Sequence, residues 1–159
     1  MTQSADDARL TVHLSDEDAT LRLGAQLAAG LSRGLKIYLS GDLGAGKTTL
    51  ARGLLRGLGY EGRVKSPTYT LMELYKLPKL CLYHFDFYRL KEANEWQEAG
   101  FRESFAGTAV CLVEWPEQAQ DLLPEPDLWI RLEHSAHGRL ARIEALTKAG
   151  ARCIRALRS

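Results

Sequence analysis

The sequence predicts an α/β fold in which an open, twisted, mostly parallel sheet carries antiparallel additions and flanking helices. Short apolar segments alternate with helical patterns through the first two thirds of the chain, and a glycine-rich turn joins one such segment to a helix. Two late segments, residues 128–133 and 139–146, have the pattern of an antiparallel hairpin. Alternation of strands and helices favours a parallel centre, to which a hairpin adds antiparallel strands.

Length and composition favour one soluble globular domain over the whole chain. The sequence has 159 residues, of which 45% are hydrophobic and 26% are charged, so it is long enough to bury a substantial core. No repeat or low-complexity linker divides it. Because residues 1–10 are mostly polar, we expect them to form a flexible tail.

The first half of the chain begins with an amphipathic helix. Ser15 is the predicted N-cap, acids follow it in the first turn, and the apolar spacing continues until about Gly34. The elements predicted after it are a strand over 35–39, a helix over 47–58, a loop over 63–67 and a strand over 68–75.

The second half contains two apolar segments, residues 80–85 and 109–113, that predict further strands. Each is followed directly by an acid, Asp86 after the first and Glu114 after the second. The segments around them are predicted to be mostly helical over 91–105, a short helix or loop over 116–123, the hairpin, and a final helix.

Charge and cysteine content argue against several classes of protein. Lys and Arg number 21 against 20 for Asp and Glu, which is no signature of a polyanion-binding protein. The C-terminal arginines are interpreted as a solvated helix face, with contact to a nucleic acid left open. The three cysteines form no C-x-x-C pair, so neither a zinc site nor a disulfide framework is expected.

The location expected for the chain is the cytoplasm. The N-terminal segment MTQSADDARLT has no apolar signal core, and no apolar segment reaches membrane-spanning length. We therefore expect no membrane partner.

The strongest motif is GDLGAGKT, residues 41–48, which matches the phosphate-loop pattern G-x-x-x-x-G-K-[ST] between a predicted strand and a predicted helix. The glycines let backbone N–H groups converge on phosphate oxygens at the positive end of the helix. Lys47 adds charge for the β- and γ-phosphates, and the hydroxyl of Thr48 suits Mg²⁺. The expected fold is therefore that of the P-loop nucleoside triphosphatases.

A phosphate loop needs a carboxylate near its metal, and such an acid commonly follows an apolar strand beside the strand of the loop. Asp86 and Glu114 both meet this condition at the ligand-binding edge of an open sheet. Both are expected to face the metal or the attacking water, and the pattern leaves their division of roles open. His84 shares a strand face with Asp86, so it could position the acid or fill a polar core site.

The base of the bound nucleotide is inferred from the absence of a guanine-recognition motif. Guanine-specific switches carry an N-K-x-D segment, and this sequence has none. That favours adenine, or loose base recognition, over guanine.

Four segments in this order, GDLGAGKTT, KSPTYTL, YHFDFYRL and CLVEWPE, closely resemble the bacterial TsaE (YjeE) family. Those proteins are ATPases required for making the N6-threonylcarbamoyladenosine modification at position 37 of tRNAs that read ANN codons. The resemblance runs from about Leu14 to at least Leu132. The last three segments are far more specific than the phosphate loop, which many unrelated proteins share.

The resemblance implies ATP (or ADP) and Mg²⁺ at the loop, with the phosphates and the metal on named residues. Thr48 and Glu114 are the implied metal ligands, Asp86 lies close to the metal or its water, and Lys47 and Asp86 are the implied catalytic residues. The segment around Ser66, Pro67, Thr68 and Thr70 is similar to a switch that senses the γ-phosphate. The implied nucleotide-binding residues are Glu17, Gly41, Gly44, Ala45, Gly46, Lys47, Thr48, Thr49, Thr68, Gly138 and Arg139.

The resemblance also implies partners: a TsaD–TsaB complex, with TsaC supplying threonylcarbamoyl-adenylate. Hydrolysis is then expected to be slow without partners and to drive an assembly or conformational cycle. Two alternatives stay open from the residues alone, a small-molecule kinase with Arg89 or Arg102 on a lid, and a non-enzymatic ATP-binding switch.

Overall fold

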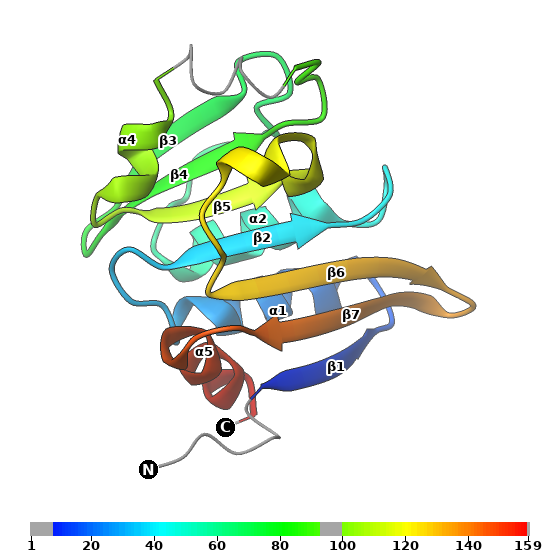
Figure 1. Ribbon diagram of the computed structural model, residues 1–159. Coiled ribbons are helices and arrows are strands. Elements are labelled where there is room, and N and C mark those ends of the chain that lie inside the picture. The colour runs from blue at the N-terminus through cyan, green and yellow to red at the C-terminus, as the bar shows by residue number, and fades with distance from the viewer. Residues whose placement is uncertain (1–7, 93–99, 159) are drawn as a thin grey trace.

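The computed structural model describes residues 8–92 and 100–158 of the chain. In this part of the chain a seven-stranded sheet has the order β1-β7-β6-β2-β5-β4-β3 (Figure 1). The strands are β1 (Arg9–Leu14), β2 (Lys36–Ser40), β3 (Met72–Lys76), β4 (Cys81–Asp86), β5 (Val110–Glu114), β6 (Leu128–Ser135) and β7 (Gly138–Ala145). The helices are α1 (Glu17–Ala28), α2 (Lys47–Gly57), α4 (Arg102–Ala106) and α5 (Lys148–Arg158), with a 3-10 segment η2 (Pro116–Leu122).

The four central strands, β6, β2, β5 and β4, run parallel, while β3, β7 and β1 are antiparallel additions at the two sides. Strand β5 is buried along its whole length, as expected for a parallel strand that is covered on both faces. The carboxyl ends of the parallel strands meet at one edge, on the right in Figure 1. The predicted fold, a mostly parallel α/β sheet with antiparallel additions, is confirmed.

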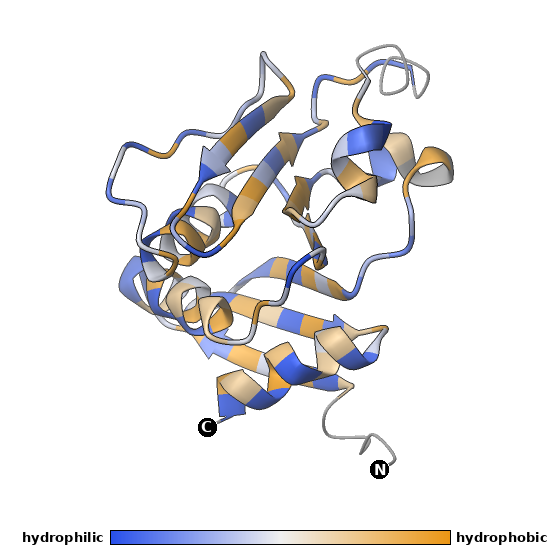
Figure 2. Cartoon of the chain, turned by 90° about the vertical axis from the view of Figure 1, so that its left-hand side faces the viewer, coloured by the Kyte–Doolittle hydropathy of each residue, from blue (hydrophilic) through white to orange (hydrophobic). Residues whose placement is uncertain are grey.

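Helices cover both faces of the sheet and bury two separate apolar clusters. Helices α1 and α2 lie behind the sheet in Figure 1, whereas α4 and η2 lie in front of it, and Figure 2 shows the two layers from the side. The cluster under α1, α2 and α5 is aliphatic and contains Leu54 and Ile130. The cluster under α4 and η2 is aromatic and contains Phe85 and Phe105, whose rings stack at a centroid distance of 4.8 Å.

Glycines bring α1 and α2 into close contact, which fixes α2 and its N-terminus on the sheet. A Cβ atom on Gly24 would lie 2.4 Å from the carbonyl oxygen of Leu50, and one on Gly53 would lie 2.2 Å from that of Leu21. Any side chain at these two positions would force the helices apart.

The expected N-terminal tail is wrong for Arg9 and Leu10, which belong to β1, and residues 1–7 lie outside the described part. Strand β1 alternates exposed with less exposed residues and pairs with β7 in a register that sets Leu14 opposite Arg139. Its sequence alternates Leu10, Val12 and Leu14 with polar residues, which is the pattern of a strand covered on one face, and the prediction overlooked this signal.

Three predicted boundaries also change. Asp16, not Ser15, caps α1, its Oδ1 accepting the N–H of Ala19 at 2.8 Å, and the helix ends at Ala28 instead of near Gly34. The strand predicted over 68–75 begins only at Met72, because residues 66–71 form turns: the N–H of Leu71 donates to the carbonyl of Pro67. Of the helix predicted over 91–105, residues 93–99 lie outside the described part and α4 covers 102–106.

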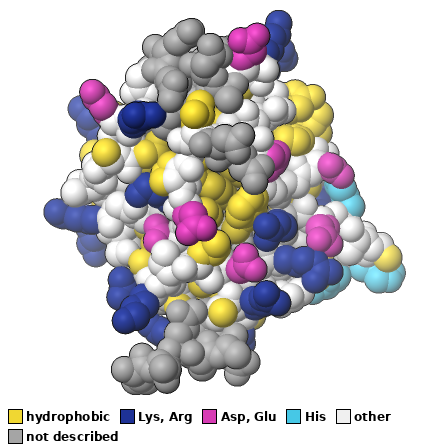
Figure 3. All heavy atoms as spheres, viewed as in Figure 1, with side chains coloured by type: hydrophobic (Ala, Val, Ile, Leu, Met, Phe, Trp, Pro, Cys, Tyr) yellow, Lys and Arg dark blue, Asp and Glu magenta, His cyan; other side chains and the backbone are white. Residues whose placement is uncertain are grey.

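The remaining elements with predicted bounds agree with the sequence prediction within two residues, including α2 and the β6–β7 hairpin. The final helix, predicted without bounds, is α5. In Figure 3 basic and acidic side chains are interspersed over the face that the view shows. Among the described residues, the longest apolar helical stretch is too short to cross a membrane.

Candidate functional site

The phosphate loop connects β2 to α2 at the edge where the parallel strands end. Gly41, Gly44 and Gly46 all have positive φ values, 152°, 78° and 105°, which other residues adopt only at a cost in strain. Gly46 is the N-cap of α2 and no side chain caps the helix there. The first-turn N–H groups of α2 therefore remain available to a bound anion.

Lys47 is buried, with 6% of its surface exposed, and its ammonium group is held by the loop itself. Its Nζ donates to the carbonyl oxygens of Gly41 and Asp42, and lies 4.0 Å from the centre of the Trp115 ring. Burial lowers the pKa of Lys47, while the nearby carboxylates Glu114 and Asp86 act in the opposite direction. The described contacts of this ammonium group thus come from carbonyls and a ring, without an ion pair.

A cleft of about 370 Å³ opens in front of the loop and is bounded by the loop, the start of α2, the two strand-end acids and the aromatic rings beside them. Its lining residues are Leu43, Gly44, Gly46, Lys47, Thr48, Thr49, Ser66, Thr68, Asp86, Tyr88, Glu114 and Trp115.

The two acids at the strand ends lie side by side, because Asp86 and Glu114 pair in the parallel register of β4 and β5. Both are buried, with 3% and 2% of their surface exposed. The hydroxyl of Ser66 lies within hydrogen-bonding reach of both, at Asp86 Oδ2 and, at 3.2 Å, at Glu114 Oε2. A single hydroxyl proton can serve one of them at a time, so the pair retains unused acceptor capacity for a cation.

Each carboxylate also has contacts of its own. Asp86 Oδ1 accepts the backbone N–H of Tyr88 at 2.9 Å, and Asp86 Oδ2 accepts the hydroxyl of Thr68 at 3.2 Å. Glu114 Oε2 lies 2.6 Å from Nε2 of His84, a side chain with no exposed surface.

Two non-glycine residues in the described chain have positive φ, and both adjoin these acids. Leu71, at φ 69°, accepts the backbone N–H of Asp86 at 3.0 Å, and Trp115, at φ 56°, directly follows Glu114. Such conformations are uncommon and persist where the surroundings impose them, often at functional sites.

A second pocket, of about 330 Å³, lies on the other side of the loop, between the loop, the start of α1 and the start of β7. Arg139 Nη2 donates to the carbonyl oxygen of Gly44 at 3.0 Å. Gly138 lies so close to β1 that a Cβ atom there would be 2.2 Å from the carbonyl oxygen of Leu14. Glu17 lines this pocket and pairs with Arg52 at 3.7 Å.

Comparison with known proteins places the chain in one family. The family model described as "Threonylcarbamoyl adenosine biosynthesis protein TsaE" matches residues 14–142. The chain belongs to the TsaE family.

The individual relatives agree over most of their length. The tRNA threonylcarbamoyladenosine biosynthesis protein TsaE of Haemophilus influenzae is 42% identical over 152 residues, covering 92% of this chain and 96% of that protein. The protein of the same name from Bacillus subtilis is 41% identical, covering 70% of each chain. The crystal structure of YdiB from Bacillus subtilis superposes with a TM-score of 0.80 at 31% identity, over 94% of this chain and 95% of that one.

In this TsaE-family chain, most predicted site residues line the cleft, the second pocket or both, and two line neither. Gly44, Gly46 and Thr49 line both pockets, whereas Lys47, Thr48, Thr68, Asp86 and Glu114 line the cleft, and Glu17, Gly138 and Arg139 line the second pocket. Gly41 and Ala45 line neither: Ala45 is fully buried and its N–H donates to the carbonyl of Asp42 at 3.1 Å. Their predicted nucleotide contacts stay predictions.

The resemblance implied that Ser66 belongs to the γ-phosphate switch, and the structure shows that its hydroxyl contacts both acids. At the start of the N-terminal helix only Glu17 was named, whereas Leu14, Ser15 and Asp16 also line the second pocket. The signal that could have placed Leu14 is the alternation of apolar and polar residues along β1, which was overlooked.

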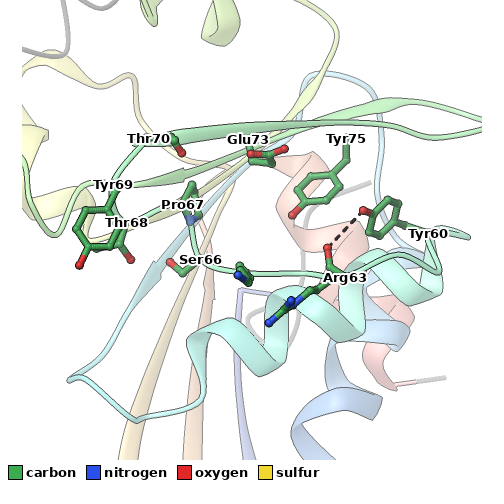
Figure 4. A pocket seen from close by; sticks show the side chains of 10 residues that line it. Tyr60, Arg63, Ser66, Pro67, Thr68, Tyr69, Thr70, Glu73 and Tyr75 are labelled. Atoms are coloured by element: carbon green, nitrogen blue, oxygen red, sulfur yellow. Dashed lines mark hydrogen bonds between the residues drawn. The ribbon is translucent and has the colours of Figure 1, made fainter.

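An outer pocket lies across segment 66–70 from the cleft, and Ser66 and Thr68 line both (Figure 4). Tyr60 and Tyr75 meet edge to face there, with ring centres 4.9 Å apart. Segment 66–70, which contacts the acids, therefore separates the cleft from the outer pocket.

Proposed function

We propose that the chain is a Mg²⁺-dependent ATPase that acts in the biosynthesis of threonylcarbamoyladenosine in tRNA, hydrolysing ATP to cycle a TsaB/TsaD complex. Membership of the TsaE family supports the pathway, since the curated relatives are named for it. The observation that carries the chemistry is the adjacent pair Asp86 and Glu114, which lines one cleft with the phosphate loop and Lys47.

The donor set of the cleft fits Mg²⁺. In the described residues no group of three or more His, Cys, Asp or Glu side chains gathers to hold a metal. Mg²⁺ does not need such a group, because it is commonly held by one or two carboxylates together with substrate phosphates and water. Thr48, Glu114 and Asp86 would hold it here, and when bound it would neutralise charge on the β- and γ-phosphates.

The protein's own groups bind and orient the nucleotide. The uncapped N–H groups at the start of α2 suit the phosphates, and Lys47 can exchange its loop carbonyls for phosphate oxygens. The nucleoside then extends toward the pocket of Glu17, Gly138 and Arg139 on the other side of the loop. Arg139 donates to the loop at Gly44, so its support of the nucleoside includes holding the loop itself.

Asp86 and Glu114 are the groups that can orient the attacking water and accept its proton. Both are buried and hydrogen-bonded, which holds their oxygens in place as the reaction proceeds. The kinase alternative needs an arginine over the phosphates, but Arg89 lies over the ring of Tyr69, 4.4 Å from its centre, and does not line the cleft.

The test is mass analysis of tRNA nucleosides after deletion of the gene in its own host. We expect threonylcarbamoyladenosine to disappear and to return when the wild-type gene is restored. Purified chain should hydrolyse ATP slowly alone and faster with TsaB and TsaD. Unchanged tRNA modification would refute the pathway, and ATP turnover that transfers the phosphoryl group to a small-molecule acceptor would favour a kinase.

A further inference from the structure

His84 is a fully buried polar side chain behind the two acids of the cleft. It lies on β4 two residues before Asp86, so both side chains project to the same face of the sheet, and it is paired with Leu112 of β5. That face belongs to the aliphatic cluster, which contains Leu82 and Leu112. An imidazole in such surroundings requires an explanation, because burying a polar ring is unfavourable unless its nitrogens are hydrogen-bonded.

The ring has one strong hydrogen bond, and it goes to Glu114. Nε2 of His84 lies 2.6 Å from Oε2 of Glu114, whereas Nδ1 is buried and has no hydrogen-bond partner among the described residues. When Glu114 is ionised, a proton on Nδ1 alone would leave two acceptors facing each other at that distance. Because an ionised carboxylate can only accept, Nε2 then donates to Glu114.

A residue that merely filled space here would do better as leucine. Leucine would bury no unpaired nitrogen, and the strand neighbours in the aliphatic cluster are already apolar. The imidazole gains over leucine only through its contact with Glu114. This points to a role for His84 in the site, not in packing.

The hydrogen bonds that hold the carboxylates of Asp86 and Glu114 indicate that role. Segment 66–70 provides Ser66, which contacts both carboxylates. Outside that segment each carboxylate has one further hydrogen-bond partner: the N–H of Tyr88, in the turn after β4, for Asp86, and His84 of β4 for Glu114. If a ligand takes the place of Ser66, each carboxylate still keeps one fixed hydrogen bond.

We infer that His84 is a positioning residue that holds Glu114 in place when Ser66 gives up its contact to a metal-bound nucleotide. This inference rests on the proposed function, because it assigns His84 to the site where Mg²⁺ and ATP would bind. His84 touches neither of them and acts only through Glu114.

The first test compares variants by calorimetric titration with ATP, in excess Mg²⁺ and in EDTA. His84→Leu removes the donor and should lose about 10-fold to 100-fold of the affinity that Mg²⁺ adds, as is typical when a partner of a metal ligand is removed. Its affinity for ATP in EDTA should not change. His84→Gln places an amide N–H near the position of Nε2 and should retain most of the Mg²⁺ effect.

Leu82→Val is the matched control, because Leu82 is fully buried on the same strand face and pairs with Val110, four residues before Glu114. It should keep the wild-type Mg²⁺ effect even if its melting temperature falls. An equal Mg²⁺ effect in wild type and His84→Leu would overturn the inference, as would an equal loss in His84→Leu and Leu82→Val. If the wild type binds no ATP in Mg²⁺, the proposed function fails instead.

The second test needs no nucleotide, so it can refute the inference about His84 independently of the proposed function. A long-range ¹H–¹⁵N spectrum of the metal-free protein reports which ring nitrogen of each histidine carries a proton, and His84→Gln identifies the signal of His84. We expect the proton on Nε2. A ring protonated on Nδ1 alone would overturn the inference whatever happens to ATP binding, and whether or not His84→Leu folds.

Discussion

The two sides of the phosphate loop are built in different ways. On the cleft side, Asp86 and Glu114 come from the ends of two parallel strands and lie among charged and hydroxyl-bearing side chains. On the other side, the pocket is formed by the end of β1, the start of α1 and the start of β7, where Gly138 and Leu14 bring two backbones together.

On the proposed function, the two sides divide the work: the buried carboxylates and the lysine of the cleft would act on the phosphate chain and its metal, where water is largely excluded. The second pocket, lined by Asp16, Glu17 and Arg139 and by several hydroxyls, would hold the nucleoside with smaller energies. The predictions below test this division.

Lys47→Ala should have the largest effect. It removes the one lysine of the cleft, and a hydrogen bond to a charged group contributes about 1.5–3 kcal/mol, so ATP affinity should fall roughly 10-fold to 150-fold. Calorimetry measures this, with Lys79→Ala at the far end of the sheet as a control. Cells that carry only Lys47→Ala should lack the tRNA modification, and normal modification would contradict the whole assignment.

Glu114→Gln and Asp86→Asn should separate binding from turnover. Each keeps the shape of the side chain but removes a charge, so ATP should still bind in EDTA while hydrolysis falls by a factor of about 100 or more. Single-turnover assays with TsaB and TsaD measure the rate. If either variant keeps full tRNA modification in cells without turnover, the chain acts as a passive ATP-binding switch.

Arg139→Ala should have a moderate effect, confined to binding. It removes a hydrogen bond to Gly44, and a typical bond of this kind is worth about 0.5–1.5 kcal/mol, which predicts a twofold to roughly tenfold loss of ATP affinity. The turnover rate at saturating ATP should not change. Arg142→Ala, whose arginine pairs with exposed Glu133, is the control. A large fall in the turnover rate of Arg139→Ala would contradict the claim that the second pocket contributes to binding alone.

The pH dependence of ATP affinity should show the smallest effect. Burial lowers the pKa of Lys47, so its charge, present below that pKa, is lost as the pH rises through it, at a pH below the ordinary value of 10.5. The phosphates change little there, because their last pKa is about 6. Affinity should thus fall with rising pH in the wild type.

Two variants test whether the pH dependence of ATP affinity comes from Lys47, on the cleft side of the loop. Arg139→Ala should follow the wild-type pH dependence, because arginine stays charged throughout the range. Lys47→Ala should show a flat profile in titrations above pH 8. A flat profile in the wild type would show that Lys47 contributes no charge to phosphate binding.

The sequence predicted the cleft side better than the other side. The phosphate-loop pattern is local, so residues 41–48 could be placed between a strand and a helix without knowing the fold. Asp86 and Glu114 were predicted because acids directly after apolar strands of a parallel sheet meet at one edge, and the register of β4 and β5 confirms their proximity.

The other side was predicted only through family resemblance. The residues of β1 alternate apolar with polar, as in a strand covered on one face, but residues 1–10 were interpreted as a tail. Leu14 and Ser15 were therefore not placed at the pocket from the pattern. Residues 68–71, which form turns, were likewise predicted to be strand, because Thr and Tyr favour strands wherever no tertiary contact decides otherwise.

The sequence by itself determined the phosphate loop, the parallel centre of the sheet and the identity of the acids, because each depends on residues adjacent in the chain. Only the tertiary structure decided that Ser66 contacts both acids and that His84 stands behind Glu114, 30 residues away. Those contacts arise from strand order and register, which depend on how the whole core packs, and no local pattern encodes them.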